Sequence, residues 1–200
     1  MSEMTKGTQG TSGTKEGGGF IPAHGGYQNL LSFQKARIVY HGTVHFCEHH
    51  VDRRSRTHDQ MIQAARSGKQ NILEGSQASG TSKETEIKLT NVARASLEEL
   101  LEDYRDFLRT HGATEWPRNH PYTHRLRMLC RQPHNDYATF QRGIEHPDPA
   151  IAANVLIGLI KLTNYLLDRQ LHHLEQAFLH QGGLRERMTQ ARLRTRSPKP

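Results

Sequence analysis

The sequence predicts an all-α protein, an up-down antiparallel four-helix bundle with a Pro-rich, partly helical insert between its third and fourth helices. Three observations support this prediction. Apolar residues recur at spacings of three and four over four long stretches, which is the period of an amphipathic helix. No stretch shows the strict alternation of apolar and polar residues that is typical of a half-buried strand. Capping residues, glycines and prolines stand where the periodic stretches begin and end.

The composition indicates that only part of the chain belongs to the bundle. Hydrophobic residues make up 34% of the 200 residues and the mean hydropathy is −0.78, both low for a compact domain. We expect a disordered leader at residues 1–26, the bundle at 27–183 and a basic tail at 184–200. The leader lacks the apolar core of a signal peptide, no run approaches the roughly 18 apolar residues of a membrane span, and cysteines are few. A cytoplasmic protein is expected.

The first helix is expected over residues 28–52. Its apolar side is predicted to consist of Leu30, Phe33, Arg37, Tyr40, Val44, Cys47 and Val51. Arg37 interrupts this stripe, and the neighbouring Ala36 can take its place in the core. Gly42 lowers helix propensity by about 1 kcal/mol relative to alanine, so its presence indicates a close contact with another helix.

The second helix is expected over residues 57–74, with Thr57 as its N-cap. One side carries small residues that let another backbone approach closely: Ala64, Ala65, Ser67 and Gly68. Gly75 suits the position just after a helix, where the backbone often needs a positive φ. Residues 76–80 are then expected to form the connecting turn.

The third helix is expected over residues 82–110, because Thr81 or Ser82 can cap its start and His111-Gly112 can end it. The insert follows at residues 111–148, and two short helices are expected within it, Tyr122–Arg131 and Asp136–Gly143. It contains the only tryptophan, Trp116, so we expect it to pack against the bundle. Connections of this length are usually functional or disordered.

The fourth helix is expected over residues 149–181, with Asp148 as its N-cap and Pro149 at its first position. Its apolar stripe is broad, which predicts the most buried helix of the bundle. Gly182-Gly183 is expected to end it. Leu184, Met188 and Leu193 favour one more short helix at the start of the basic tail.

Three motifs in the second and third helices carry a family resemblance: Gln63-Ala64-Ala65-Arg66-Ser67, Asn71-Ile72-Leu73-Glu74-Gly75, and Ala93-Arg94-Ala95-Ser96-Leu97-Glu98-Glu99-Leu100. This stretch resembles the bacterial four helix bundle family that includes the proteins encoded by intervening sequences of 23S ribosomal RNA genes. It is also similar to the accessory variability proteins of diversity-generating retroelements. The resemblance implies a left-handed up-down bundle that assembles as a ring, commonly a homopentamer, without known catalysis. The accessory variability proteins bind nucleic acid and a reverse transcriptase, which suggests both as partners.

Arginines are the candidate nucleic-acid-binding residues. The tail holds six of the cations and one acid, and so supplies +5 of the net charge of +7. A basic tail favours polyanions such as RNA or DNA, although a solubilising role is an equal alternative. Other arginines stand between the first two helices and beside the aromatic residues of the insert, where phosphate contact and base stacking can combine. The predicted set is Arg53, Arg54, Arg56, Arg125, Arg127, Arg131, Arg185, Arg187, Arg192, Arg194 and Arg196.

A metal site and a catalytic site are weaker hypotheses. His41, His45 and His49 repeat every fourth residue, and two imidazoles at that spacing can share zinc or nickel. The alternative is a polar stripe beside the apolar seam, which we favour because no carboxylate is clearly placed on a facing helix. The chain contains no Glu-x-x-His pair, phosphate-binding loop or nucleophile elbow. We therefore expect neither an enzyme nor a cofactor.

The sequence thus favours a non-enzymatic, self-associating bundle that binds nucleic acid, in particular structured RNA, or a nucleic-acid-processing protein. The first alternative is a protein-binding scaffold whose insert and Glu-rich third helix make the contacts. The second is a metal-binding bundle that uses the histidine stripe.

Overall fold

The computed structural model of the chain describes residues 26–132 and 135–196, and these residues form helices and no strand. The predicted disordered leader therefore lies outside the described residues, apart from Gly26. The elements are a 3-10 helix η1 (Tyr27–Asn29) and the α-helices α1 (Leu31–His50), α2 (Arg56–Ala78), α3 (Lys83–Thr110), α4 (Pro121–Arg131), α5 (Tyr137–Ile144), α6 (Pro149–Gln181) and α7 (Leu184–Arg196). The all-α prediction is confirmed for this part of the chain.

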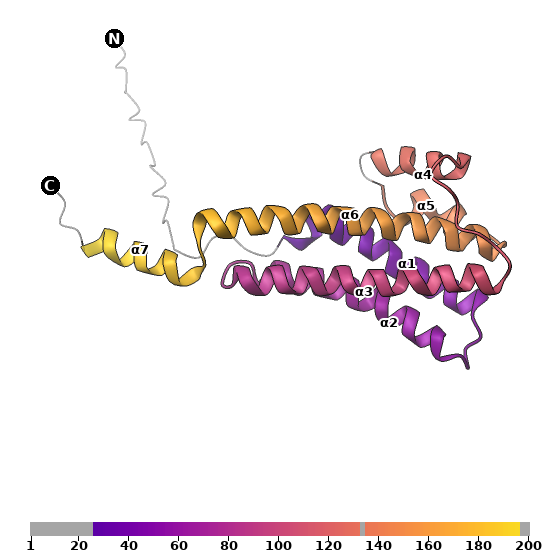
Figure 1. Ribbon diagram of the computed structural model, residues 1–200, viewed down its shortest axis with the longest axis horizontal. Helices are drawn as coiled ribbons and strands as arrows, with labels where there is room; N and C mark the ends of the chain where they lie inside the picture. The colour runs from indigo at the N-terminus through magenta and orange to yellow at the C-terminus, as the bar shows by residue number, and fades with distance from the viewer. Residues whose placement is uncertain (1–25, 133–134, 197–200) are drawn as a thin grey trace, which may run out of the picture.

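Four long helices lie along the length of the molecule and pack side by side (Figure 1). The packed pairs are α1 with α2, α2 with α3, α3 with α6, and α6 with α1. The two helices of the insert cover this layer near the end where α6 begins, because α5 packs on α6 and α1 while α4 packs on α6. Helix α7 extends beyond the opposite end, past the α2–α3 turn.

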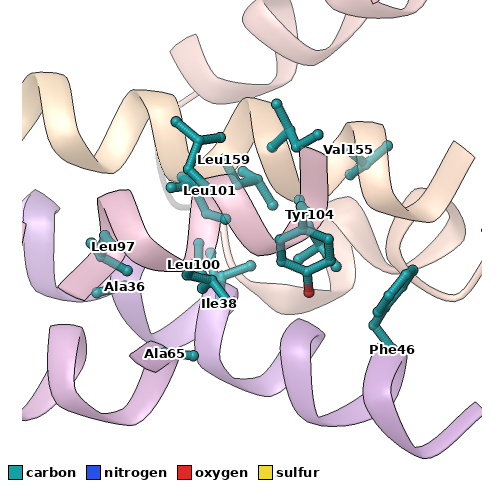
Figure 2. Packing of buried hydrophobic residues seen from close by; sticks show 14 of the residues in the cluster. Ala36, Ile38, Phe46, Ala65, Leu97, Leu100, Leu101, Tyr104, Val155 and Leu159 are labelled. Carbon is teal, nitrogen blue, oxygen red and sulfur yellow. The ribbon is translucent and has the colours of Figure 1, made fainter. Parts of the chain in front are cut away.

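The core lies between the four long helices (Figure 2). Leu97, Leu100 and Tyr104 of α3 are completely buried, and so are Phe46 of α1 and Leu159 of α6. The ring of Tyr104 meets that of Phe46 edge-on at a centroid distance of 5.0 Å. Its hydroxyl donates a hydrogen bond of 3.1 Å to the buried hydroxyl of Thr43, which satisfies both polar groups inside the core.

Two predicted close contacts between helices are confirmed. A Cβ atom on Gly42 of α1 would lie 2.6 Å from Leu156 Cδ2 of α6. A Cβ atom on Gly68 of α2 would lie 2.7 Å from Leu97 Cγ of α3. Both separations are shorter than real contacts allow, so glycine at these positions sets how closely the helices pack.

The end of α2 differs from the prediction. The helix continues through Gly75 to Ala78, and Gly75 does not have a positive φ. A Cβ atom at this position would lie 3.4 Å from the backbone oxygen of Glu86, so Gly75 faces the first turn of α3 rather than a loop. The helix also begins slightly earlier than predicted. Ser55, not Thr57, is the N-cap, and its side chain accepts a hydrogen bond from the Thr57 backbone.

The buried side of α1 is broader than predicted. Leu30, Tyr40, Val44 and Val51 of the predicted stripe are only half-buried, whereas Ile38, Val39 and Phe46 are in the core. Helix α1 packs on α2, α6 and the insert helix α5, and its Phe46 ring also meets the Tyr104 and Phe107 rings of α3, so several sides of α1 are covered. At one position the prediction is confirmed, because Ala36 is buried and Arg37 is exposed.

The predicted boundaries of the later helices are confirmed. Asp148 accepts a hydrogen bond from the Ala150 backbone, with Pro149 opening α6. Gly112 and Gly182 both have φ of +65° and follow the ends of α3 and α6. The two insert helices and the tail helix also stand within a few residues of where the sequence placed them.

Helix α6 is the most apolar element. The stretch Pro149–Leu193 is long and apolar enough to cross a membrane, with a mean hydropathy of 1.6 in its best window, although the sequence suggested no such run. Of that window, 61% is buried inside the protein. A core helix of a soluble protein passes the same test, so the finding is weak evidence for a membrane span.

Candidate nucleic-acid interface

The predicted arginines form three separate groups. Arg53 and Arg54 lie in the α1–α2 connection and Arg56 opens α2, and all three are exposed. Arg125, Arg127 and Arg131 are exposed on α4. Helix α7 carries the tail arginines beyond the far end of the molecule (Figure 1). The structure does not bring the three groups together within one copy of the chain.

The charges of these groups are not used inside the fold. The arginines of α3 form ion pairs, Arg94 with Asp168 of α6, Arg105 with Glu102 and Glu115, and Arg109 with Asp106. By contrast, no predicted interface arginine pairs with a carboxylate among the described residues. The exposed guanidinium groups among them therefore remain available to an anion, and in the described part of the chain only the Arg127 guanidinium donates a hydrogen bond, 3.3 Å long, to a backbone carbonyl, that of Arg118.

The tail helix orders part of the third group. Glu186, the only acid of the tail, accepts a hydrogen bond of 2.9 Å from the Gly183 backbone and so caps the start of α7. Arg185, Arg192 and Arg196 are exposed, while Arg187 is half-buried and its Nε and Nη2 atoms have no partner among the described residues. The side chain of Arg194 lies outside the described part.

Three rings gather beside α4 at the start of the insert. Trp116 and His120 are stacked, with centroids 4.8 Å apart and an interplanar angle of 9°. Tyr122 lies against both, at 5.2 Å from Trp116 and 5.5 Å from His120. Tyr122 is 51% exposed, so this ring cluster reaches the surface. Sequence patterns identified the aromatic residues of the insert but not their mutual stacking.

Buried polar contacts hold the Trp116 backbone on α6. The side chain of Asn154, only 4% exposed, accepts a hydrogen bond of 2.7 Å from the Trp116 backbone and donates to the Thr114 carbonyl at 3.1 Å. Glu115 accepts a hydrogen bond of 2.9 Å from Arg105 of α3 and a second from Lys161 of α6. Burial raises the pKa of the Glu115 carboxyl, but the two hydrogen-bonded cations outweigh it and lower the pKa overall.

A pocket of about 400 Å³ opens between the ring cluster and helices α4, α5 and α6. Leu126, Phe140 and Val155 contribute an apolar floor. Arg125 of α4 also lines it, together with two residues that sequence reasoning missed, Arg142 and His146. Arg142 lies in α5 and His146 lies two residues after its end, and their spacing of four residues was the available signal. The sequence did not show that both line a pocket with α4 and α6.

The histidine stripe does not assemble a metal site. His45 and His49 stack on each other at 4.0 Å, and His49 Nδ1 lies 2.7 Å from the His45 carbonyl oxygen. His41 lies apart beside Tyr40 and Tyr137, and burial, followed by the charges of Lys69 and Arg37, lowers its pKa. Within residues 26–132 and 135–196, no group of three His, Cys, Asp or Glu side chains has a geometry that could hold a metal ion.

The chain was compared with protein-family models, with curated proteins and with solved structures, and none of the three comparisons gives a match.

Proposed function

We propose that the chain is a bacterial, cytoplasmic, non-enzymatic protein that binds nucleic acid, in particular structured RNA, and self-associates. In this proposal α1, α2, α3 and α6 form an up-down four-helix bundle, and α4 and α5 form an insert on it. The cyclic packing of the four helices supports this architecture. The resemblance of the second and third helices to the bacterial four helix bundle family supports self-association as a ring, with a pentamer as the expected form.

One observation carries the functional part of the proposal. Of the arginines that sequence patterns selected, all those whose side chains are described are exposed except the half-buried Arg187, and none forms an ion pair among the described residues, whereas the arginines of α3 are paired. Unpaired surface arginines attract phosphate, because the guanidinium group donates two parallel hydrogen bonds and releases counterions from the nucleic acid.

The separation of the three groups favours a large ligand. A small anion meets only one group, while a folded RNA or a DNA duplex is long enough to reach from α4 or the α1–α2 connection to α7. A ring of several copies would also place groups of neighbouring chains beside one another. The alternative partner is a nucleic-acid-processing protein such as a reverse transcriptase.

The test is the salt dependence of binding, measured by fluorescence anisotropy with a labelled RNA hairpin. We expect the affinity to fall steeply as salt rises from 50 to 200 mM, on the order of ten-fold for every two or three phosphates neutralised. Alanine at Arg53, Arg54 and Arg56 together, or deletion of residues 184–200, should each weaken binding and flatten the salt slope. Arg66→Ala with Arg169→Ala, two exposed arginines outside the predicted groups, is the control. An RNA affinity that does not change with salt, or that the deletion leaves unchanged, contradicts the proposal.

A protein-binding scaffold is the second candidate, and exposed apolar residues favour it. Tyr165 of α6 is 57% exposed and Val92 of α3 is 40% exposed, each within one turn of the Arg94–Asp168 ion pair that joins these helices. Light scattering during purification distinguishes the candidates. An oligomer of the 22.8 kDa chain that carries nucleic acid supports the first, and a nucleic-acid-free complex with another protein supports the second.

A further inference from the structure

The pocket beside α4 has fixed walls. Helix α4 approaches α6 closely at Gly158, where any Cβ atom would collide with the Leu126 side chain. Helix α5 approaches α6 at Gly143, where a Cβ atom would lie 3.0 Å from Val155 Cγ2. The fourth wall carries Trp116, whose backbone is bound to the buried Asn154 side chain. The cavity between these contacts is thus part of the packed structure, and its volume of about 400 Å³ falls in the range of small-ligand sites.

The chemistry of the lining suits an anion with a flat apolar part. Arg125 and Arg142 line the pocket, neither forms an ion pair among the described residues, and none of the lining residues is acidic. His146 Nδ1 accepts a hydrogen bond of 3.0 Å from the Asp148 backbone, so the neutral ring keeps its proton on Nε2 as a further donor. Trp116 and Tyr122 stand at the same opening above a floor of aliphatic and aromatic side chains.

We propose that this pocket binds a single nucleotide, with the base against Trp116 and Tyr122 and the phosphate at Arg125 and Arg142. The stack of His120 on one side of Trp116 holds the indole in place, as a stacking platform requires. Two sources share this chemistry, a free nucleoside monophosphate and an unpaired nucleotide of an RNA strand. The second source rests on the proposed RNA binding, whereas the first does not.

The chain offers a direct signal for occupancy, because Trp116 is its only tryptophan. The full chain is titrated with uridine and adenosine monophosphate, and with ribose 5-phosphate as a ligand without a base, while tryptophan fluorescence is followed. We expect saturable quenching by the nucleotides and weaker binding of ribose 5-phosphate. Arg142→Ala and Tyr122→Ala should each raise the dissociation constant about tenfold. Arg66→Ala is the control, since Arg66 is exposed on α2, belongs to none of the predicted arginine groups and does not line the pocket.

A second arm separates the two sources. An RNA hairpin with an unpaired loop and a blunt duplex without one are titrated, with fluorescence and anisotropy recorded together. Quenching by the hairpin but not by the duplex assigns the site to unpaired RNA nucleotides. Quenching by mononucleotides alone assigns it to a free nucleotide. The proposed RNA binding then fails only if anisotropy also shows no bound hairpin, and the pocket stands in either case.

Other outcomes overturn the inference. If the hairpin binds by anisotropy but neither it nor millimolar nucleotide changes Trp116 fluorescence, the pocket is not a nucleotide site, although RNA binding stands. The same holds if Arg66→Ala weakens nucleotide binding as much as Arg142→Ala. Circular dichroism shows whether each variant is folded, and the exposed position of Tyr122 makes its variant the safest on that account.

Discussion

Lys35 is a buried cation without a carboxylate partner among the described residues. It is 4% exposed, and its ammonium lies 5.5 Å from the centre of the Phe140 ring. Burial lowers its pKa, and the nearby Cys130 opposes this only in part. Burying this ammonium therefore lowers the stability of the folded state, and the burial comes from the packing of α5 onto α1. The residues next to Lys35 in the sequence did not indicate that it would be buried.

We expect Lys35→Met to stabilise the protein at pH 7 by about 1 kcal/mol, since an apolar side chain of similar length removes the cost of burying the charge. The folded state holds this proton less tightly than the unfolded state, so wild-type stability rises with pH between the lowered folded pKa and the ordinary value near 10.4. The advantage of the variant should shrink over that window. Urea unfolding of both proteins at pH 6, 8 and 10 checks this, and an advantage that stays constant with pH would contradict it.

The fold favours the charged form of Glu115, whereas it disfavours the charged form of Lys35. Hydrogen bonds from Lys161 and Arg105 more than offset its burial and lower its pKa, so the carboxylate stabilises the folded state above its unfolded pKa. This contribution is lost as pH falls through the folded pKa. Glu115→Gln should cost about 1 kcal/mol at pH 7 and progressively less below about pH 4.5. Thermal unfolding between pH 3 and 7 measures the difference, with the exposed Glu102→Gln as the control for Arg105. An equal loss at pH 3 and 7 would assign the effect to shape rather than charge.

Sequence patterns located the charged and aromatic residues of the insert but not the contacts that make them a site. Trp116 and Arg125 were selected from composition and neighbours, whereas Arg142, His146 and Asn154 were not. The partner of Trp116 is Asn154, which is 38 residues away in the chain, and a pattern within one helix cannot report such a pairing.

At the level of elements, the sequence predicted helix ends correctly where neighbouring residues in the chain determine the backbone conformation. The Asp148-Pro149 start of α6 and the glycines after α3 and α6 follow from capping and backbone sterics, and they were predicted. Gly75 was misplaced because a glycine inside a helix and one after a helix look alike in sequence. The neighbouring helix decides between them, and here α3 packs over Gly75.

Gly68 and Gly75 of α2 differ in how closely α3 approaches them, and alanine substitutions can measure the effect on stability. Gly68→Ala should destabilise the protein by about 1–3 kcal/mol, because the new Cβ would lie 2.7 Å from the branch point of the completely buried Leu97. This penalty exceeds the gain of about 1 kcal/mol in helix propensity. Gly75→Ala is the matched control, since its nearest contacts would be 3.4 Å, and it should be neutral or slightly stabilising. The urea midpoints of the two variants measure their stabilities. Equal changes at both positions would contradict the prediction and would mean that the Leu97 side chain moves aside freely.

For the whole molecule, charge and stability reside in different parts. The core is shared by α1, α2, α3 and α6, with the insert packed on it, while the tail supplies +5 of the net charge of +7. None of the principal helix–helix packings among the described residues involves α7. The motifs of the second and third helices thus lie in the packed core, and the arginines and the pocket that we propose to bind a ligand lie around them.

Deletion of residues 184–200 tests this division directly. We expect the thermal midpoint to change by less than about 2 °C, because a helix outside the shared core contributes little to the cooperative transition. The mass of the assembly in light scattering should remain the same multiple of the truncated chain. RNA affinity should nevertheless fall and its salt dependence flatten, since most of the surplus positive charge is gone. A lower midpoint or a smaller assembly would instead make α7 part of the structural unit, and the half-buried Arg187 would then be the first residue to examine for a packing role.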